Sequence, residues 1–169
     1  MAKGKTLFIV RHGKSNWDYE NAADMDRPLN SRGINDAHNM AGRLSKKQIL
    51  PDLLFTSPAI RALHTAIIFS MELNSPLEKI KIDKAFYHTY PEEIVSYIQK
   101  TDNSINSIMI FGHNPGFTDL ANLFVIESIS NVPTSGIVEL SFGTDTWENI
   151  GNKTLRSEYF DYPKKHKNF

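Results

Sequence analysis

The chain has 169 residues, of which 40% are hydrophobic and 22% charged, so it is long and apolar enough to fold around one core. Nineteen basic residues balance nineteen acidic ones, which excludes the overall positive charge that non-specific nucleic-acid or anionic-membrane binding requires. The absence of cysteine excludes disulfides, thiol nucleophiles and cysteine-bound zinc or iron-sulfur clusters.

The first elements alternate between a strand pattern and a helix pattern. The β-branched apolar run over residues 6–10 predicts a strand buried on both faces. Asn30 is a candidate N-cap for a helix that ends near Lys47, because apolar residues recur there at helical spacing. The remaining elements follow in chain order: a strand over 53–56, a helix that Ser57 caps and Pro58 enters, a half-exposed strand over 79–86, a helix opening at Pro91, a strand over 105–111, a helix over 117–126, and strands over 137–142 and 155–159.

This alternation predicts a single-domain α/β fold, a three-layer sandwich with a mainly parallel central sheet and helices on both faces. We expect one domain over residues 1–169, with a surface turn over 143–153 and a frayed tail over 162–169. No run approaches the roughly 20 apolar residues of a membrane span, and the N-terminus lacks a signal-peptide core. We therefore expect a cytoplasmic protein with no nucleic-acid or membrane partner.

Three predicted strands end in residues that carry chemistry. These ends are Arg11-His12-Gly13, Thr56-Ser57-Pro58 with Arg61 one turn later, and Gly112-His113-Asn114. Ligands of parallel sheets bind beyond the carboxyl ends of the strands, so the three ends are expected to meet. Arginine matches phosphate oxygens, and two histidines can divide nucleophilic and stabilising roles. The pattern indicates a phosphate site.

Other catalytic patterns do not occur in the chain. It contains no G-x-S-x-G elbow, H-E-x-x-H, Walker A or G-x-G-x-x-G motif, so the chemistry is assigned to histidine and arginine. A metal at His12 and His113 is disfavoured because the neighbouring arginines would repel a cation. We expect no metal and no organic cofactor.

These motifs resemble those of the histidine phosphatase superfamily, also called phosphoglycerate mutase-like. The block Asp26-Arg27-Pro28-Leu29-Asn30, followed by Arg32-Gly33, is similar to the small phosphohistidine phosphatases of the SixA-like group. The resemblance implies the phosphoglycerate mutase-like fold and a covalent phosphohistidine on His12. It also implies that Arg11, Arg61 and His113 bind and stabilise the phosphoryl group. Further candidates for binding phosphate or substrate are Lys14, Ser15, Asn16 and Asn114.

One part of the superfamily pattern is missing. Many larger members carry a carboxylic acid in a segment inserted after the second arginine, and residues 61–86 leave little room for such an insertion. Glu92, or its neighbour Glu93, is the nearest candidate acid. The SixA-like group lacks this acid, which suits a phosphohistidine substrate because a protonated imidazole leaves readily.

Three functions remain open from the sequence. The first is a phosphatase that removes phosphate from histidine on a protein of the histidine phosphotransfer type, with phosphate ion as product. The second is a phosphatase of small phosphate esters with the same core residues. The third is a phosphate-recognising binding module without turnover.

Overall fold

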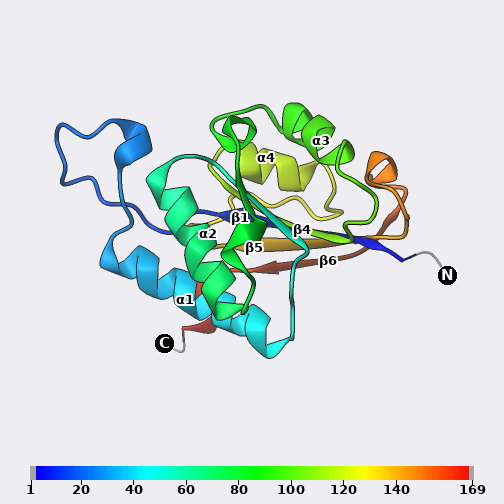
Figure 1. The fold of residues 1–169 in the computed structure, drawn as a ribbon, viewed down its shortest axis with the longest axis horizontal. Helices are drawn as coiled ribbons and strands as arrows, with labels where there is room; N and C mark the ends of the chain where they lie inside the picture. Colours follow the sequence, from blue (N-terminus) through cyan, green and yellow to red (C-terminus); the bar gives the residue numbers. More distant parts are fainter. Residues whose placement is uncertain (1–2, 168–169) are drawn as a thin grey trace.

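A six-stranded sheet forms the centre of the protein in a computed structural model that describes residues 3–167 (Figure 1). The strands are β1 (Lys5–Arg11), β2 (Leu53–Thr56), β3 (Ile80–Ile82), β4 (Ser107–Gly112), β5 (Ile137–Phe142) and β6 (Leu155–Asp161), in the order β3-β2-β4-β1-β5-β6. The first four strands in this order pair in parallel, and β5 and β6 extend the sheet with antiparallel pairing. The predicted α/β class with a mainly parallel sheet is confirmed.

Helices cover both faces of this sheet. The four α-helices are α1 (Ser31–Lys46), α2 (Ile60–Glu72), α3 (Pro91–Gln99) and α4 (Gly116–Asn122). Successive side chains of β1 enter different cores: Leu7 and Ile9 pack with residues of α3 and α4, whereas Phe8 and Val10 pack with α1 and α2. Within residues 3–167, no helix has the length and apolar character needed to cross a membrane.

Five short 3-10 helices connect the larger elements. They are η1 (Asp24–Asp26), η2 (Leu77–Lys79), η3 (Lys84–Phe86), η4 (Trp147–Asn149) and η5 (Pro163–His166). η5 covers part of the predicted frayed tail, and Lys165 Nζ donates to Phe160 O there at 2.8 Å. Residues 168 and 169 of that tail lie outside the described residues.

The caps of the first two helices came out differently. The prediction for Asn30 is confirmed, since its Oδ1 accepts a hydrogen bond from Gly33 N at 2.8 Å. The prediction for Ser57 is wrong, because α2 begins after Ala59, whose extended backbone precedes the first turn. The Ser57 hydroxyl is buried between Ala59 and His113: its Oγ accepts from Ala59 N at 3.1 Å and lies 2.7 Å from His113 Nε2. A residue that looked like a cap therefore belongs to the strand-end cluster.

Two predicted elements are shorter in the structure. The strand expected over 79–86 spans only Ile80–Ile82, because the Asp83 side chain accepts from Ala85 N and turns the chain into η3. The helix expected over 117–126 ends at Asn122, whose side-chain amide bonds to both the N–H and the carbonyl of Ile129 and folds the chain back.

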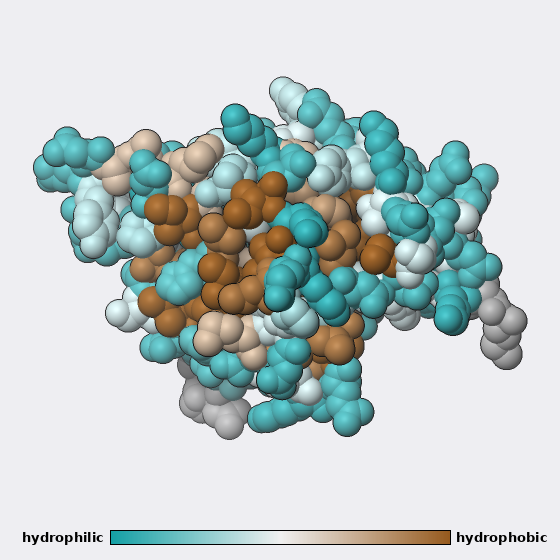
Figure 2. Space-filling view, in the orientation of Figure 1, coloured by the Kyte–Doolittle hydropathy of each residue, from teal (hydrophilic) through white to brown (hydrophobic). Residues whose placement is uncertain are grey.

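The segment 143–153, expected to be a surface turn, contributes to the core. Trp147 is fully buried in it, and its Nε1 donates to Ile105 O at 2.8 Å. Turn-forming residues surround this tryptophan in the sequence, so the local composition predicted a surface turn and did not indicate that Trp147 is buried in the core. Apolar residues of α2, in contrast, reach the surface: Ile60 and Met71 are exposed. Figure 2 shows that apolar residues gather on this face of the molecule.

Candidate active site

The three chemically loaded strand ends meet at one edge of the sheet. Arg11 of β1 is paired with Gly112 of the parallel strand β4, and Thr56 of β2 is paired with Phe111 of β4. Here a cleft of about 310 Å³ is lined by Arg11, His12, Lys14, Ser15, Trp17, Asp24, Arg27, Arg61, His88, His113, Asn114 and Thr134. The position is the one at which parallel sheets bind ligands.

His12 is held as a neutral imidazole. Its Nδ1 lies 2.6 Å from Gly13 O, which can only accept, so Nδ1 carries the hydrogen. The lone pair is then on Nε2, where Arg61 Nε donates at 3.3 Å. Burial, together with the charges of Arg61 and Arg11, lowers the pKa of His12 to about 3 despite the opposing hydrogen bond to Gly13. Near neutral pH the imidazole is uncharged and its Nε2 is available for attack.

His113 is a second neutral imidazole beside the first. Its Nδ1 accepts from Arg61 Nη2 at 3.2 Å, so its Nε2 carries the hydrogen and donates to Ser57 Oγ. Burial lowers the pKa of His113 to about 2, and the charges of His12 and Arg61 act in the same direction. The ring centroids of His12 and His113 are 5.0 Å apart. An oxyanion bound here would meet both imidazoles.

Arg61 connects these groups from the first turn of α2. Its side chain is 2% exposed, and its Nε and Nη2 contact the two histidines. Its other edge binds Asp24, with Nη1 2.5 Å from Asp24 O and Nη2 2.9 Å from Asp24 Oδ2. One guanidinium thus orients both imidazoles and is itself clamped by a carboxylate.

Arg11 contributes a further donor to the cleft. Its Nη1 donates to Val132 O at 3.0 Å, whereas its Nε is buried without a hydrogen-bond partner. A buried donor without an acceptor is costly, so an anion in this cleft would satisfy a group that the protein leaves open.

Arg27 was not among the predicted site residues. It is 7% exposed, its Nη1 donates to Ser15 Oγ at 2.7 Å, and its guanidinium lies 3.5 Å from the centroid of the Trp17 ring. The sequence contained a signal for it, because Arg27 belongs to the block that carries the SixA-like resemblance. The cleft therefore holds a third arginine.

Asp24, also missed, binds the arginines together. Its carboxylate accepts from Arg27 at 2.9 Å, from Arg61 at 2.9 Å and from the Tyr87 hydroxyl at 2.8 Å. Although burial acts to raise the pKa of Asp24, these hydrogen bonds hold it well below its usual value. Asp24 is the one carboxylate lining the cleft, against Lys14 and three arginines, so the site carries net positive charge.

The remaining predicted residues divide into two groups. Lys14, Ser15 and Asn114 line the cleft, and Asn114 Oδ1 also accepts from Thr118 N at the start of α4. Asn16 and Glu92 are not part of the cleft lining. Asn16 Oδ1 instead accepts from Asp18 N at 2.9 Å and shapes a turn, and Glu92 lies in the first turn of α3.

A glycine contact fixes the loop that carries His12. A Cβ atom on Gly33 would lie 2.1 Å from Lys14 O, so the first turn of α1 packs directly against the backbone that follows His12. The described part of the chain groups no three histidine or carboxylate side chains as ligands for a metal. The three arginines and Lys14 in the cleft lining suit an anionic ligand.

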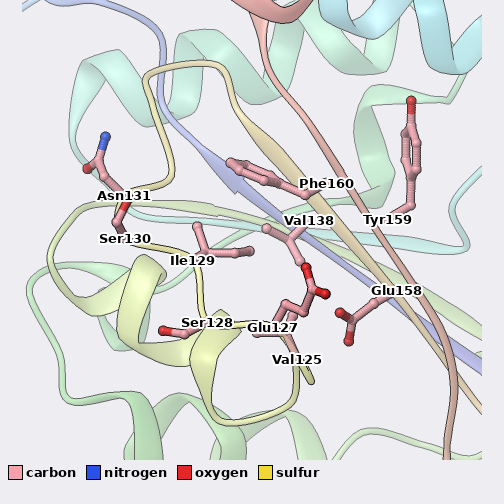
Figure 3. A pocket seen from close by; sticks show the side chains of 10 residues that line it. All are labelled: Val125, Glu127, Ser128, Ile129, Ser130, Asn131, Val138, Glu158, Tyr159 and Phe160. Carbon is pink, nitrogen blue, oxygen red and sulfur yellow. The ribbon is translucent and has the colours of Figure 1, made fainter.

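A second hollow of about 340 Å³ has a different lining (Figure 3). It lies between residues 125–131 and strands β5 and β6, with Val125, Ile129, Val138 and Phe160 on its apolar walls. Its ionisable residues are the carboxylates of Glu127 and Glu158 and the phenol of Tyr159. It contains no cationic side chain, so it lacks the means to bind phosphate.

Comparisons with known proteins agree with this geometry. The model of the histidine phosphatase superfamily (branch 1) matches residues 7–86, which include Arg11, His12, Arg27 and Arg61. An uncharacterized chloroplastic protein of Arabidopsis thaliana is 29% identical over 154 residues, spanning 85% of this chain and 69% of that protein. A 2,3-bisphosphoglycerate-dependent phosphoglycerate mutase of Clavibacter michiganensis subsp. michiganensis is 39% identical over 70 residues, and the match spans 40% of this chain and 28% of the mutase.

Solved structures extend the likeness to almost the whole fold. A candidate phosphohistidine phosphatase SixA from Agrobacterium tumefaciens has a TM-score of 0.80 and 25% identity, covering 94% of this chain and 98% of that one. The protein histidine phosphatase SixA complexed with tungstate has a TM-score of 0.78 and 23% identity, covering 96% of this chain and 99% of that one, and it shares the fold. Residues 7–86 of the chain, with His12 and its arginines, thus resemble the histidine phosphatase superfamily, and the fold of the chain is that of the SixA structures.

Proposed function

We propose that the protein is a phosphatase that works through a phosphohistidine on His12 and removes phosphate from histidine on a protein partner. The observation that carries this proposal is the neutral His12, whose Nε2 lone pair faces a cluster of arginines. A nucleophile, a positive site and a second neutral imidazole are the parts that phosphoryl transfer through histidine needs.

The first step transfers the phosphoryl group to the enzyme. The Nε2 lone pair of His12 attacks phosphorus and forms a P–N bond, while the bond to the leaving group breaks on the opposite side. Arg61 and Arg11 donate to the equatorial oxygens, where the charge of the transition state gathers. His113 helps to position Arg61, because its Nδ1 accepts from Arg61 Nη2 while its Nε2–H donates to Ser57 Oγ.

The second step returns the enzyme to its starting state. Water attacks the phosphorus of phosphohistidine 12, the P–N bond breaks, and inorganic phosphate leaves. The hydrogen bond from Nδ1 to Gly13 O keeps the ring in one tautomer, so the electron pair of the broken bond returns to Nε2. His12 is then ready for another attack.

Two observations support a phosphohistidine on a protein as the substrate. The exposed aromatic side chains of Trp17, Tyr19 and Tyr90 belong to the cleft lining or to segments next to it. Exposed aromatic residues favour protein contacts. The SixA-like fold covers nearly the whole chain, whereas the likeness to the mutase covers 28% of that enzyme.

A small phosphate ester is the second candidate substrate. The chain is 39% identical over 70 residues to a phosphoglycerate mutase, an enzyme of a small phosphate ester, so a core of this kind could act on a metabolite. The two functions share the first residues of the mechanism and differ in the leaving group.

The test is phosphate release from a phosphohistidine-bearing phosphotransfer protein, a phosphoserine peptide and a sugar phosphate, each with the wild type and with His12→Ala. A His12-dependent preference for phosphohistidine is the expected result. Preference for an ester would move the assignment to a metabolite phosphatase. Stable binding of the phosphorylated protein without turnover would make the chain a binding module.

A further inference from the structure

The cleft contains a third imidazole, His88, which the mechanism above does not use. His88 lines the cleft together with His12, Arg61 and His113, and its ring centroid is 4.9 Å from that of His113. Its side chain is 48% exposed, whereas His12 and His113 are 8% and 3% exposed. His88 therefore stands on the solvent side of the buried histidine pair.

The backbone of His88 holds the ring in this place. Its φ angle of 49° lies in the left-handed region, which residues with a Cβ atom adopt rarely. Its neighbour Tyr87 is anchored by the hydrogen bond from its hydroxyl to Asp24, and the Tyr87 ring packs edge-on against His88 at 4.4 Å. His88 Nε2 lies 3.4 Å from the same carboxylate, at Asp24 Oδ2. Tyr87 and Asp24 thus fix an unfavourable backbone conformation that directs an imidazole into the cleft.

The reaction needs a proton donor at this side of the cleft. The leaving group departs on the face of the phosphorus opposite His12, toward solvent; an alkoxide must be protonated as it leaves, and the water of the second step must lose a proton for either substrate. Asp24, the one carboxylate in the lining, is ionised and committed to Arg27 and Arg61. Glu92 lies outside the lining. Histidine is the side chain that can both give and accept a proton near neutral pH.

We infer that His88 is the general acid and base of this phosphatase, oriented by Asp24. The inference rests on the proposed function and adds the residue that handles protons. In the first step the His88 imidazolium gives a proton to the leaving atom as the bond from phosphorus to that atom breaks. In the second step neutral His88 takes a proton from the attacking water as the P–N bond to His12 breaks. The imidazolium is restored, and no other reactant is consumed.

The surroundings of His88 suit this cycle. An imidazolium carries hydrogen on both nitrogens, so one can face Asp24 while the other serves the leaving group. The charged and titratable groups around it are Asp24, Arg27, Arg61, Tyr87 and His113. His12 and His113 are buried and neutral, so His88 is the exposed imidazole of the three.

The inference predicts an effect that depends on the leaving group. His88→Gly removes the ring, and glycine accepts a φ of 49° without strain, so the fold is expected to persist. For p-nitrophenyl phosphate, whose leaving group needs no proton, kcat/KM is expected to fall far less than for a phosphoserine peptide, while kcat falls because hydrolysis of the phosphoenzyme loses its base. For a phosphoserine peptide, kcat/KM is expected to fall about 10²-fold or more. An acid-labile phosphoenzyme is expected to accumulate, and added imidazole is expected to restore turnover.

A matched control is His38→Gln, because His38 pairs with Glu72 at 2.7 Å and is not part of the cleft lining. This variant is expected to behave as wild type with both substrates. Equal losses of His88→Gly on both substrates, without imidazole rescue, would reduce His88 to a packing residue and overturn the inference, as would wild-type rates. Failure of the proposed function is separate, since wild-type protein would then release no phosphate from p-nitrophenyl phosphate in a His12-dependent way.

Discussion

Two hollows of similar size differ in almost every chemical respect. The cleft at the strand ends measures about 310 Å³ and the hollow beside β5 and β6 about 340 Å³. Cationic and imidazole side chains line the first, whereas apolar side chains and the carboxylates of Glu127 and Glu158 line the second. Volume therefore does not identify the site of chemistry; the convergence of donors on one point does.

The cause of the difference lies in the direction of the strands. β1, β2 and β4 are parallel, so their carboxyl ends and the residues that follow them meet at one edge. β5 and β6 are antiparallel, so the ends beside the second hollow do not gather equivalent loops. A cluster of arginines is stable at the first edge because Asp24 accepts from two of them.

The first prediction concerns a substitution that removes the guanidinium donors of Arg61 but keeps its positive charge. Arg61→Lys retains a cation, but an ammonium group cannot reproduce the planar fork that contacts His12, His113 and Asp24 at once. We expect kcat to fall about 10²- to 10³-fold, as for loss of a preorganised donor. Steady-state kinetics with p-nitrophenyl phosphate measure the effect.

An arginine in the first turn of α1, outside the cleft lining, gives the control for Arg61→Lys. Arg32 is exposed and pairs with Asp36 on α1, so Arg32→Lys is expected to leave kcat unchanged. Full activity of Arg61→Lys would mean that charge alone, and not the geometry of the fork, sustains the transition state.

The second prediction uses the buried histidines to separate the cleft from the rest of the molecule by pH. Burial lowers the pKa of His12 to about 3 and that of His113 to about 2, so both stay neutral in the folded protein at pH 5. In the unfolded chain they bind protons below about pH 6.5, so acidification favours unfolding. Each histidine is expected to cost about 2 kcal/mol of the free energy of unfolding between pH 7 and pH 5.

Urea unfolding at both pH values checks this expectation. His113→Asn removes one of the two groups, so its stability should fall less between pH 7 and pH 5 than that of the wild type. His38→Gln, outside the cleft, should keep the wild-type dependence. An unchanged pH dependence in His113→Asn would show that His113 is not held neutral in the fold.

The third prediction concerns the contact between α1 and the loop after His12. Gly33→Ala would place a Cβ atom 2.1 Å from Lys14 O, so the helix or the loop must shift. We expect a loss of about 1–3 kcal/mol in the free energy of unfolding, as for overpacking, together with reduced kcat. Gly42→Ala is the matched control on the same helix, because nothing lies within 4 Å of its Cβ position.

Gly42→Ala is expected to stabilise the protein by about 0.5–1 kcal/mol, because alanine favours a helix interior over glycine. Thermal unfolding and p-nitrophenyl phosphate turnover of the two variants separate packing from propensity. Wild-type stability and turnover in Gly33→Ala would mean that the loop does not depend on this close approach.

The cleft residues that follow the strand ends could be predicted from the sequence, whereas those in the connecting loops could be predicted only in part. Periodic apolar runs place His12, Arg61 and His113 at parallel strand ends, and a general rule brings such ends together. Asp24 and His88 lie in segments without periodicity, and their positions depend on contacts between residues 37 to 64 positions apart. Local composition also misled the prediction at Trp147, whose burial is set by a bond to Ile105.

The same reasoning explains the wrong assignment of Ser57. A serine before Pro58 has the sequence pattern of a helix cap. In the structure its hydroxyl oxygen accepts a hydrogen bond from the ring of His113, which is 56 residues away in the sequence. Sequence patterns indicate what a residue can do with its neighbours in the chain. They do not show which residue from a distant part of the chain will contact it in the fold, and an active site is made of such long-range contacts.

The last and smallest expected effect tests the second hollow directly. Glu127→Gln with Glu158→Gln removes both carboxylates from its lining and leaves the apolar walls in place. Glu158 Oε2 accepts from Ile126 N at 2.8 Å, and the glutamine carbonyl can accept the same bond, so stability should change by less than about 0.5 kcal/mol. Because the hollow shares no lining residue with the cleft, kcat and KM for every phosphate substrate should equal those of the wild type.

A change in KM for the phosphorylated protein alone, with p-nitrophenyl phosphate turnover unchanged, would contradict this expectation in an informative way. The substrate protein would then reach across β5 and β6 to the second hollow while its phosphohistidine occupies the cleft. If the double variant matches the wild type on both substrates, recognition of the substrate protein is confined to the cleft and its rim, which the arginines, Trp17 and His88 line. The double variant therefore tests whether the second hollow takes part in recognising the substrate protein or has no role in phosphate release.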